Sequence, residues 1–167
     1  MKTTAESPRK SRGKVRQGFS LLEVVVGIAL IAIAVLGLAQ MFTLGILNNL
    51  KSERIANASF LAQQQVDIIR NLSSDELTTL ASANGIDLTG DGNLDILKDE
   101  AIDINNDSRL DYRRITEIVV DSSGGSAIFE VSVLVFSAEQ LGTQRSQLLL
   151  QPMQHGVKSK VNTVISR

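Results

Sequence analysis

Aspartate recurs at every fourth position through one short stretch of the chain, from Asp87 to Asp111. With Glu100, this stretch holds eight acidic side chains against Lys98 and Arg109, a net charge of −6. Carboxylate oxygens are typical ligands of Ca²⁺ in proteins. The glycines and asparagines between the aspartates disfavour a helix, on which like charges four residues apart would also repel each other. The stretch is therefore expected to form loops with the chemistry to bind a cation.

The stretch also contains an internal repeat, because residues 87–95 and 103–111 align at an offset of 16 residues. In EF-hand-like loops, positions 1, 3, 5, 7 and 9 supply oxygen ligands to Ca²⁺, and glycine at position 6 permits the turn. The expected ligands are Asp87, Thr89, Asp91, Asn93 and Asp95 in the first loop, and Asp103, Asn105, Asp107, Arg109 (through its carbonyl oxygen) and Asp111 in the second. The alternative is a solvated acidic segment that binds no metal.

The two loops resemble the calcium repeats of dockerin and thrombospondin type 3 domains, which implies Ca²⁺ as a cofactor. The resemblance is incomplete at position 12, where an EF-hand has a bidentate glutamate and this chain has Lys98 and Arg114. Ser108 also replaces the turn glycine in the second loop. Either Asp99 or Glu100 could supply the missing ligand of the first loop.

A second set of chemically unusual residues lies where a long apolar run begins. The run starts at Phe19, directly after Gly18, and one carboxylate, Glu23, interrupts it early. A carboxylate inside a membrane helix costs roughly 2.5–3.5 kcal/mol on insertion scales, so it usually has a function. A secretory signal peptide is cleaved after its apolar stretch. Here the only small residue of that kind precedes the stretch, so the apolar run would survive in the mature chain.

This junction resembles the class III leader of type IV prepilins and of type II secretion pseudopilins. The matching residues are Gly18, Phe19, Ser20, Leu21, Leu22 and Glu23. The resemblance implies cleavage after Gly18 by a prepilin peptidase, N-methylation of Phe19, and contact with an inner-membrane assembly platform. It also implies that Glu23 neutralises the N-terminal amine of a neighbouring subunit, which would reduce the desolvation cost of both charges. The alternative is an uncleaved membrane anchor whose carboxylate has no partner.

One long helix is expected to carry this junction. The apolar run from Phe19 to Leu47 can cross a hydrocarbon core of roughly 30 Å, and in lipid such a run must be helical. Further on, apolar residues recur at spacings of three and four, which predicts an amphipathic continuation over 48–72. This stripe consists of Ile55, Ala58, Ala62, Val66 and Ile69. We expect residues 19–47 to be the membrane or fibre-core part, and the stripe to pack on a head domain.

The head is expected to comprise residues 73–167, with the acidic loops of 87–111 ahead of a small antiparallel sheet. Alternating or β-rich runs predict strands at Ile115–Val120, Ala127–Ser137 and Gln147–Gln151, with a turn at 122–125 between the first two. The tail from Met153 to Arg167 is polar and is expected to be mobile. The fold class is therefore α+β, with one long helix on a small sheet, as in type IV pilins.

Charge and composition fix the orientation and exclude several functions. The first 18 residues hold six of the 17 basic side chains and one of the 18 acidic ones, which leaves 11 basic and 17 acidic side chains beyond them. A basic segment before the span stays in the cytoplasm, so the head should be translocated across the bacterial inner membrane. The chain lacks cysteine, scatters its basic residues and contains no HExxH, GxSxG or Walker motif. A disulfide, a nucleic-acid surface and an enzyme are therefore not expected.

The sequence as a whole predicts a minor pilin, an accessory subunit that leaves the inner membrane for a type IV pilus. The segments 35–40 and 61–64 are most similar to PilV-type minor pilins. A minor pseudopilin of a type II secretion system, in a periplasmic pseudopilus, is the alternative with the same leader. An alternative of another class is a membrane-anchored calcium-binding module that recognises a partner without forming a fibre.

Overall fold

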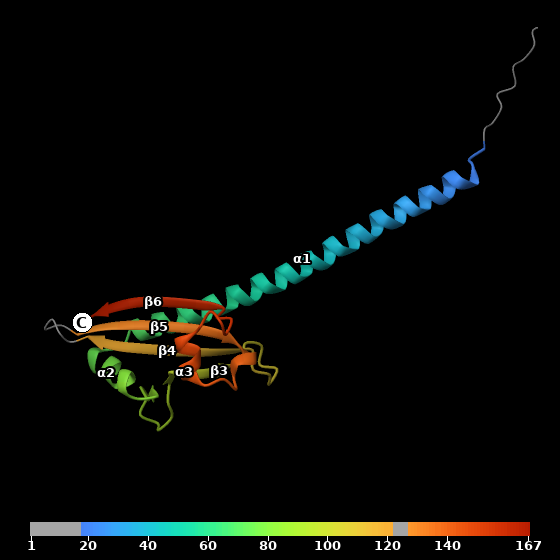
Figure 1. Ribbon diagram of the computed structural model, residues 1–167. Coiled ribbons are helices and arrows are strands. Elements are labelled where there is room, and N and C mark those ends of the chain that lie inside the picture. Colours follow the sequence, from blue (N-terminus) through green and yellow to red (C-terminus); the bar gives the residue numbers. More distant parts are fainter. Residues whose placement is uncertain (1–17, 122–126) are drawn as a thin grey trace, which may run out of the picture. The chain divides into compact units, whose positions relative to one another are not determined.

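The computed structural model describes residues 18–121 and 127–167. The basic leader and the turn expected at 122–125 lie outside the described residues. Contacts divide the chain into two units, Met1–Ile46 and Leu47–Arg167. A single helix, α1, covers Leu21–Arg70 and contributes to both units (Figure 1). The long helix expected from the sequence is therefore confirmed, with ends within two residues of those expected.

In the first unit, α1 exposes an apolar surface. Every described residue from Gly18 to Ile46 is exposed except Gly27, which is half-buried. An 18-residue window of α1 has a mean hydropathy of 2.8, and none of it is buried within the chain. By length and composition, this part of α1 can cross a membrane. Apolar surface of this extent is typical of a helix that packs against lipid or against other helices.

The second unit contains a four-stranded antiparallel sheet in the order β3-β4-β5-β6. Its strands are Asp99–Ile102, Tyr112–Asp121, Ile128–Ser137 and Ser159–Ser166. A separate hairpin pairs β1, Gly85–Ile86, with β2, Ile96–Leu97. Three further short elements are α2 (Ser74–Ser82), the 3₁₀ turn η1 (Ala138–Gln140) and α3 (Arg145–Leu150).

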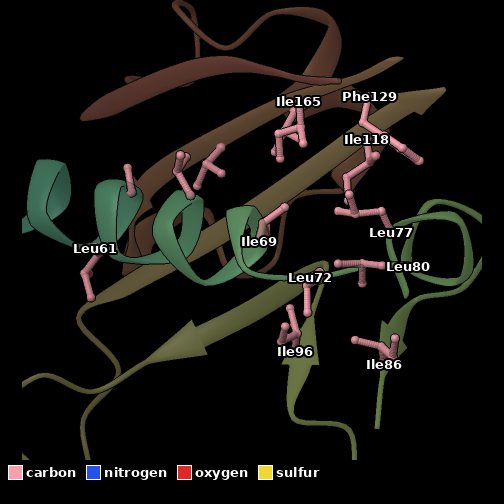
Figure 2. Close-up of a cluster of buried hydrophobic side chains, with 14 of the residues drawn as sticks. Leu61, Ile69, Leu72, Leu77, Leu80, Ile86, Ile96, Ile118, Phe129 and Ile165 are labelled. Atoms are coloured by element: carbon pink, nitrogen blue, oxygen red, sulfur yellow. The ribbon is translucent and has the colours of Figure 1, made fainter. Parts of the chain in front are cut away.

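The main core lies between the second half of α1 and one face of the sheet (Figure 2). Four residues of the expected stripe, Ala58, Ala62, Val66 and Ile69, are buried there. They pack with apolar residues of β4, β5, β6 and α2, among them Ile118, Phe129, Ile165, Leu77 and Leu80. The fifth stripe residue, Ile55, is 41% exposed and lies outside this core. The packing of the helix on a small antiparallel sheet is therefore confirmed.

The other face of the sheet is partly covered by α3. Leu148 of α3 is fully buried against Ile115, Leu134 and Phe136. Leu134 and Phe136 alternate with Val133 and Val135, which face the main core. The C-terminal half of β5 is therefore apolar on both faces, because a layer covers each of them.

Two expectations for the end of the chain are wrong. Gln147–Gln151 is not a strand, since Arg145–Leu150 forms α3. The run of leucines there is too short for its periodicity to separate a strand from a helix. The tail is not a mobile segment, because its second half forms β6, paired with β5 over eight residues. The third strand of the expected meander is thus Ser159–Ser166.

The helix α2 was also missed, although the sequence contains its start signal. Ser73 is the N-cap, and its Oγ accepts from the N–H of Glu76 while the Glu76 carboxylate accepts from the N–H of Ser73. This reciprocal pair is a capping box. The N–H of Ser73, followed by its hydroxyl, donates to the Glu76 carboxylate and lowers the pKa of Glu76. The serine pair that was expected to follow the end of the long helix therefore also starts a second helix, with Ser73 as the N-cap and Ser74 as the first residue.

Candidate functional site

Each acidic loop connects two paired strands. Residues 87–95 join β1 to β2, and residues 103–111 join β3 to β4. In both loops the N–H of position 9 donates to the carbonyl oxygen of the residue before position 1. These bonds are Asp95 to Ile86, at 2.9 Å, and Asp111 to Ile102, at 2.8 Å. The sequence repeat is therefore a repeated structural unit, a hairpin closed at its base in the same way twice.

The carboxylates fold the two loops through matching hydrogen bonds. At position 1, Asp87 accepts from the N–H of Gly92 and Asp103 accepts from the N–H of Ser108, each at 2.8 Å. At position 5, Asp91 and Asp107 each accept from the N–H two residues later, at 2.8 Å. At position 9, Asp95 and Asp111 accept from the N–H of position 2, at 2.7 and 3.0 Å. The regular spacing of aspartate is thus explained by the bonds that close each loop.

Backbone conformation repeats as well. Positions 4 and 6 of the first loop are Gly90 and Gly92, with φ of +75° and +89°. The same positions of the second loop are Asn106 and Ser108, with φ of +57° and +68°. Glycine adopts such values readily and asparagine tolerates them, whereas serine does so at some cost. The replacement of the turn glycine by Ser108 therefore leaves the turn in place.

Hydrogen bonding also favours the charged forms of two aspartates in the first loop. The N–H groups of Gly92 and Gly90 lower the pKa of Asp87. The N–H of Asn93, followed by its side-chain amide, lowers the pKa of Asp91. A carboxylate that accepts several N–H bonds is stabilised in its ionised form. Both side chains are therefore held as anions near the loop surface.

The fit of these residues to Ca²⁺ is partial. Their oxygens are of the type that Ca²⁺ prefers, and Oδ1 of Asp103 is buried without a hydrogen-bond partner. However, other side chains at expected ligand positions bond to their neighbours. Thr89 donates to Asp87 at 3.3 Å and the Asn105 amide donates to Asp107 at 3.1 Å. Within residues 18–121 and 127–167, no three acidic, histidine or cysteine side chains are arranged to hold a metal ion.

Position 12 of each loop is occupied by a buried cation that turns toward a helix. Nζ of Lys98 donates to the carbonyl oxygen of Ala81 in α2, and burial lowers its pKa. Arg114 donates to the carbonyl oxygen of Leu61 in α1 and to the Glu100 carboxylate. These two cations therefore attach the hairpins to the helices and are not ligands.

The carboxylates that could have completed the first loop are engaged elsewhere. Glu100 pairs with Arg114, and Asp99 forms a two-pronged pair with Arg113, at 2.8 and 2.7 Å. The pairing with Asp99 raises the pKa of Arg113. Arg113 also donates to the carbonyl oxygens of Gln140 and Thr143, so it fixes the segment that leads into α3. The proposal that Asp99 or Glu100 completes the first site is therefore not supported by the geometry.

The N-terminal junction lies in the first unit. Gly18 and Phe19 precede α1, and Phe19 is 83% exposed. Glu23 is in the first turn of α1, where its N–H donates to the carbonyl oxygen of Ser20 at 2.9 Å. The ion pairs among the described residues join arginines of β4 to acids of β3. Glu23 therefore has no cationic partner in the described part of its own chain.

Comparison with protein families matches residues 13–39 to the prokaryotic N-terminal methylation motif. The match includes Gly18, Phe19 and Glu23, and it ends within α1. Comparisons with curated proteins and with solved structures give no match. The match runs into the first half of α1, the long helix of a pilin-like α+β fold. The chain thus carries the N-terminal methylation motif that marks type IV pilin-like and pseudopilin-like proteins.

Proposed function

We propose that this chain is a minor pilin, an accessory subunit of a type IV pilus that is cleaved after Gly18 and methylated at Phe19. The proposal rests on one observation above all, the methylation motif that runs into the apolar first half of α1, a surface that no described residue of the chain buries. Such a surface is suited to a membrane first and to a bundle of helices afterwards.

Glu23 is proposed to act at the entry of the subunit into the fibre. A buried carboxylate needs an opposite charge, and Glu23 has none among the described residues of its own chain. The N-terminal amine released at Phe19 of a neighbouring subunit would supply that charge. A prepilin peptidase and an inner-membrane assembly platform are the further partners that this route requires.

Mass spectrometry of sheared fibres, compared with the membrane fraction, tests the proposal. The expected result is a fibre-associated chain that begins at methylated Phe19 and is scarce relative to the dominant subunit. Processed chain found only in membranes would instead support the alternative, a minor pseudopilin of a type II secretion system. Residues 1–18 still attached in working cells would exclude both. The assignment to the PilV subtype rests on the similarity of segments 35–40 and 61–64 alone. The expected ratio of this subunit to the dominant one does not depend on that assignment.

We further propose that Ca²⁺ stabilises the acidic loops. The buried, unpartnered Oδ1 of Asp103 favours the second loop as a site, and the matching folds of the two loops favour a common ligand. The expected ligands of the first loop are Asp87, Thr89, Asp91, Asn93 and Asp95, and those of the second are Asp103, Asn105, Asp107, Arg109 and Asp111. Because the oxygens do not already converge, binding would require small movements within the loops.

A recognition module anchored in the membrane is the candidate from another class. One observation favours it, a hollow of about 560 Å³ between α1 and the second loop. Arg54 and Tyr112 line this hollow together with Arg109 and Asp111 of the loop. A module of this kind would keep its location and activity in Glu23→Ala, whereas a fibre subunit would lose its place in sheared fibres. Asp67→Ala, at an exposed position of α1 outside the lining of this hollow, is the matched control.

A further inference from the structure

The four-stranded sheet has one long free edge. Its last strand, β6, pairs with β5 in an unbroken antiparallel register from Ser159 to Ser166. The opposite edge strand, β3, has only four residues. Proteins usually blunt their sheet edges by shortness, proline, bulges or charge, because unpaired edge groups bind other strands. β3 is blunted by shortness, whereas β6 contains neither proline nor glycine and only one charged residue, Lys160.

The hydrogen-bond ladder shows which backbone groups of β6 point away from the sheet. The N–H of Arg167 donates to the carbonyl oxygen of Ala127 at 3.1 Å, so these two residues form a hydrogen-bonded pair. Pairs of this kind alternate along an antiparallel ladder. The residues that bond to β5 are therefore Ile165, Thr163, Val161 and Ser159. The residues that direct their N–H and C=O groups outward are Ser166, Val164, Asn162 and Lys160.

The side chains of these outward-bonding residues have a defined chemistry. All four are exposed, and Val164 is 64% exposed. Across the sheet, Val164 pairs with Glu130, which pairs in turn with Val119, itself 54% exposed. Lys160 forms no ion pair with a described residue. The free edge is therefore apolar near its C-terminal end and cationic near its start.

We propose that β6 is an interaction surface that accepts an antiparallel strand from a neighbouring subunit of different sequence. The added strand carries an apolar side chain beside Val164 and an acidic side chain four residues later, beside Lys160. Strand addition supplies backbone hydrogen bonds for affinity and alternate side chains for specificity. The inference rests on the proposed function, because assembly brings the heads of pilin-like subunits together.

A second copy of this chain does not fit this edge. Two β6 strands paired antiparallel would be related by a two-fold axis perpendicular to the sheet. Since α1 lies along the sheet (Figure 2), the two helices would then run in opposite directions. Copies inserted in one membrane by the same basic leader share one orientation.

Pairing β6 with the β3 edge of a second copy keeps the orientation but offers few bonds. The N–H of Thr116 donates to the carbonyl oxygen of Lys98, which fixes the alternation of the ladder between β3 and β4. Only Asp99 and Ala101 then direct their backbone groups outward. The partner strand must therefore be longer than β3 and belong to another subunit.

Site-specific photo-crosslinking in the full chain, in cells that produce the fibre machinery, tests the proposal. A photo-reactive residue at Asn162 should form an adduct with a strand of another pilin-like subunit that has the apolar-x-x-x-acid pattern. The same residue at Thr79, exposed on α2, is the control and should form no such adduct. No adduct at position 162, or one mainly with a second copy of this chain, would overturn the proposal. Processing after Gly18, measured in the same cells, reports separately on the proposed function.

Two variants of β6 sharpen the test. Val164→Pro removes an outward N–H without removing a bond to β5, so the thermal unfolding temperature should change little while the crosslink yield falls about tenfold or more. Lys160→Glu should lower the yield without any change of backbone, and exchange of the partner's acid for lysine should restore it. An unchanged yield in both variants would contradict strand addition, and no recovery in the charge exchange would contradict the assigned partner chemistry.

Discussion

Arg167 donates through Nη2 to the carbonyl oxygen of Arg70, at 2.7 Å, and to that of Leu72, at 3.2 Å. The last carbonyl groups of a helix have no partner within it, and a cation there also interacts favourably with the helix dipole. Arg70 in turn donates to the hydroxyl of Thr163 in β6. β6, which forms within the segment expected to be mobile, thus holds the C-terminal end of α1 together with Arg167.

Replacement of this cap should weaken the head. For Arg167→Ala we expect the free energy of unfolding to fall by about 1–2 kcal/mol, since hydrogen bonds from a charged donor are lost. Lys160→Ala, which removes an exposed cation without such bonds, is the control and should change it by less than about 0.5 kcal/mol. Thermal unfolding of the detergent-solubilised full chain measures both. Equal effects of the two variants would argue against the cap.

The layer formed by α3 can be tested by a pair of leucines. Leu148 is fully buried and Leu150 is 82% exposed, two residues away in the same helix. Leu148→Ala should destabilise the head by about 2–5 kcal/mol, because it leaves a cavity against Phe136. Leu150→Ala should have an effect within about 0.5 kcal/mol. If Gln147–Gln151 were a strand, Leu148 and Leu150 would lie on the same face, and the two variants would destabilise the head to a similar extent. Denaturant unfolding of both variants measures the difference.

The first acidic loop should lose stability in acid. The pKa of Asp87 and that of Asp91 are lowered in the folded chain by N–H bonds. A carboxylate with a lowered folded pKa contributes stability above its unfolded value, ordinarily 3.8, and this contribution is lost as pH falls through the folded value. The protection factor of the Gly92 amide against hydrogen exchange, which corrects for the intrinsic rate at each pH, should therefore fall as Asp87 becomes protonated. In Asp87→Asn this pH-dependent loss of protection should be reduced, whereas Asp67→Asn on α1 should leave it unchanged.

Calcium should raise the unfolding temperature if the loops bind it. We expect a shift of several degrees at millimolar Ca²⁺, since a ligand that binds only the folded state stabilises it by mass action. Joint replacement of Asp87 and Asp91 by Asn should abolish the part of this temperature shift that the first loop contributes. Asp103→Asn should abolish the part that the second loop contributes. Mg²⁺ at the same concentration serves as the comparison. No shift in the native chain would leave the loops as carboxylate-capped turns.

Much of the fold could be predicted because its signals are local. The apolar run and the stripe through Ala58 and Ile69 fix α1, and the alternation through Phe129 and Val131 fixes β5. β6 could not be predicted in the same way, since as an edge strand it buries little and exposes Val164, which breaks the alternation. The capping box of Ser73 and Glu76 predicts α2, but it was missed because two adjacent serines are also typical of the end of a helix.

The candidate sites also differ in whether the features that define them are local in the sequence. The motif at Gly18, Phe19 and Glu23 is contiguous, so sequence alone indicates it. The repeat of the acidic loops was also visible, and the matching bonds of Asp87 and Asp103 give it a structural meaning. By contrast, the roles of the cations at position 12 depend on helices far away in the chain, 53 residues in the case of Arg114 and Leu61. Contacts of that range leave no periodic trace in a sequence.

The offset of sixteen residues between the two loops also has a genetic consequence. Each hairpin begins and ends at paired strands, so the chain enters and leaves the unit at neighbouring points. An in-frame duplication of such a unit adds a complete turn of structure without stretching the chain on either side. We therefore expect 16 residues to be the length of insertion that the acidic segment accommodates best, because one further copy ends where the next strand begins.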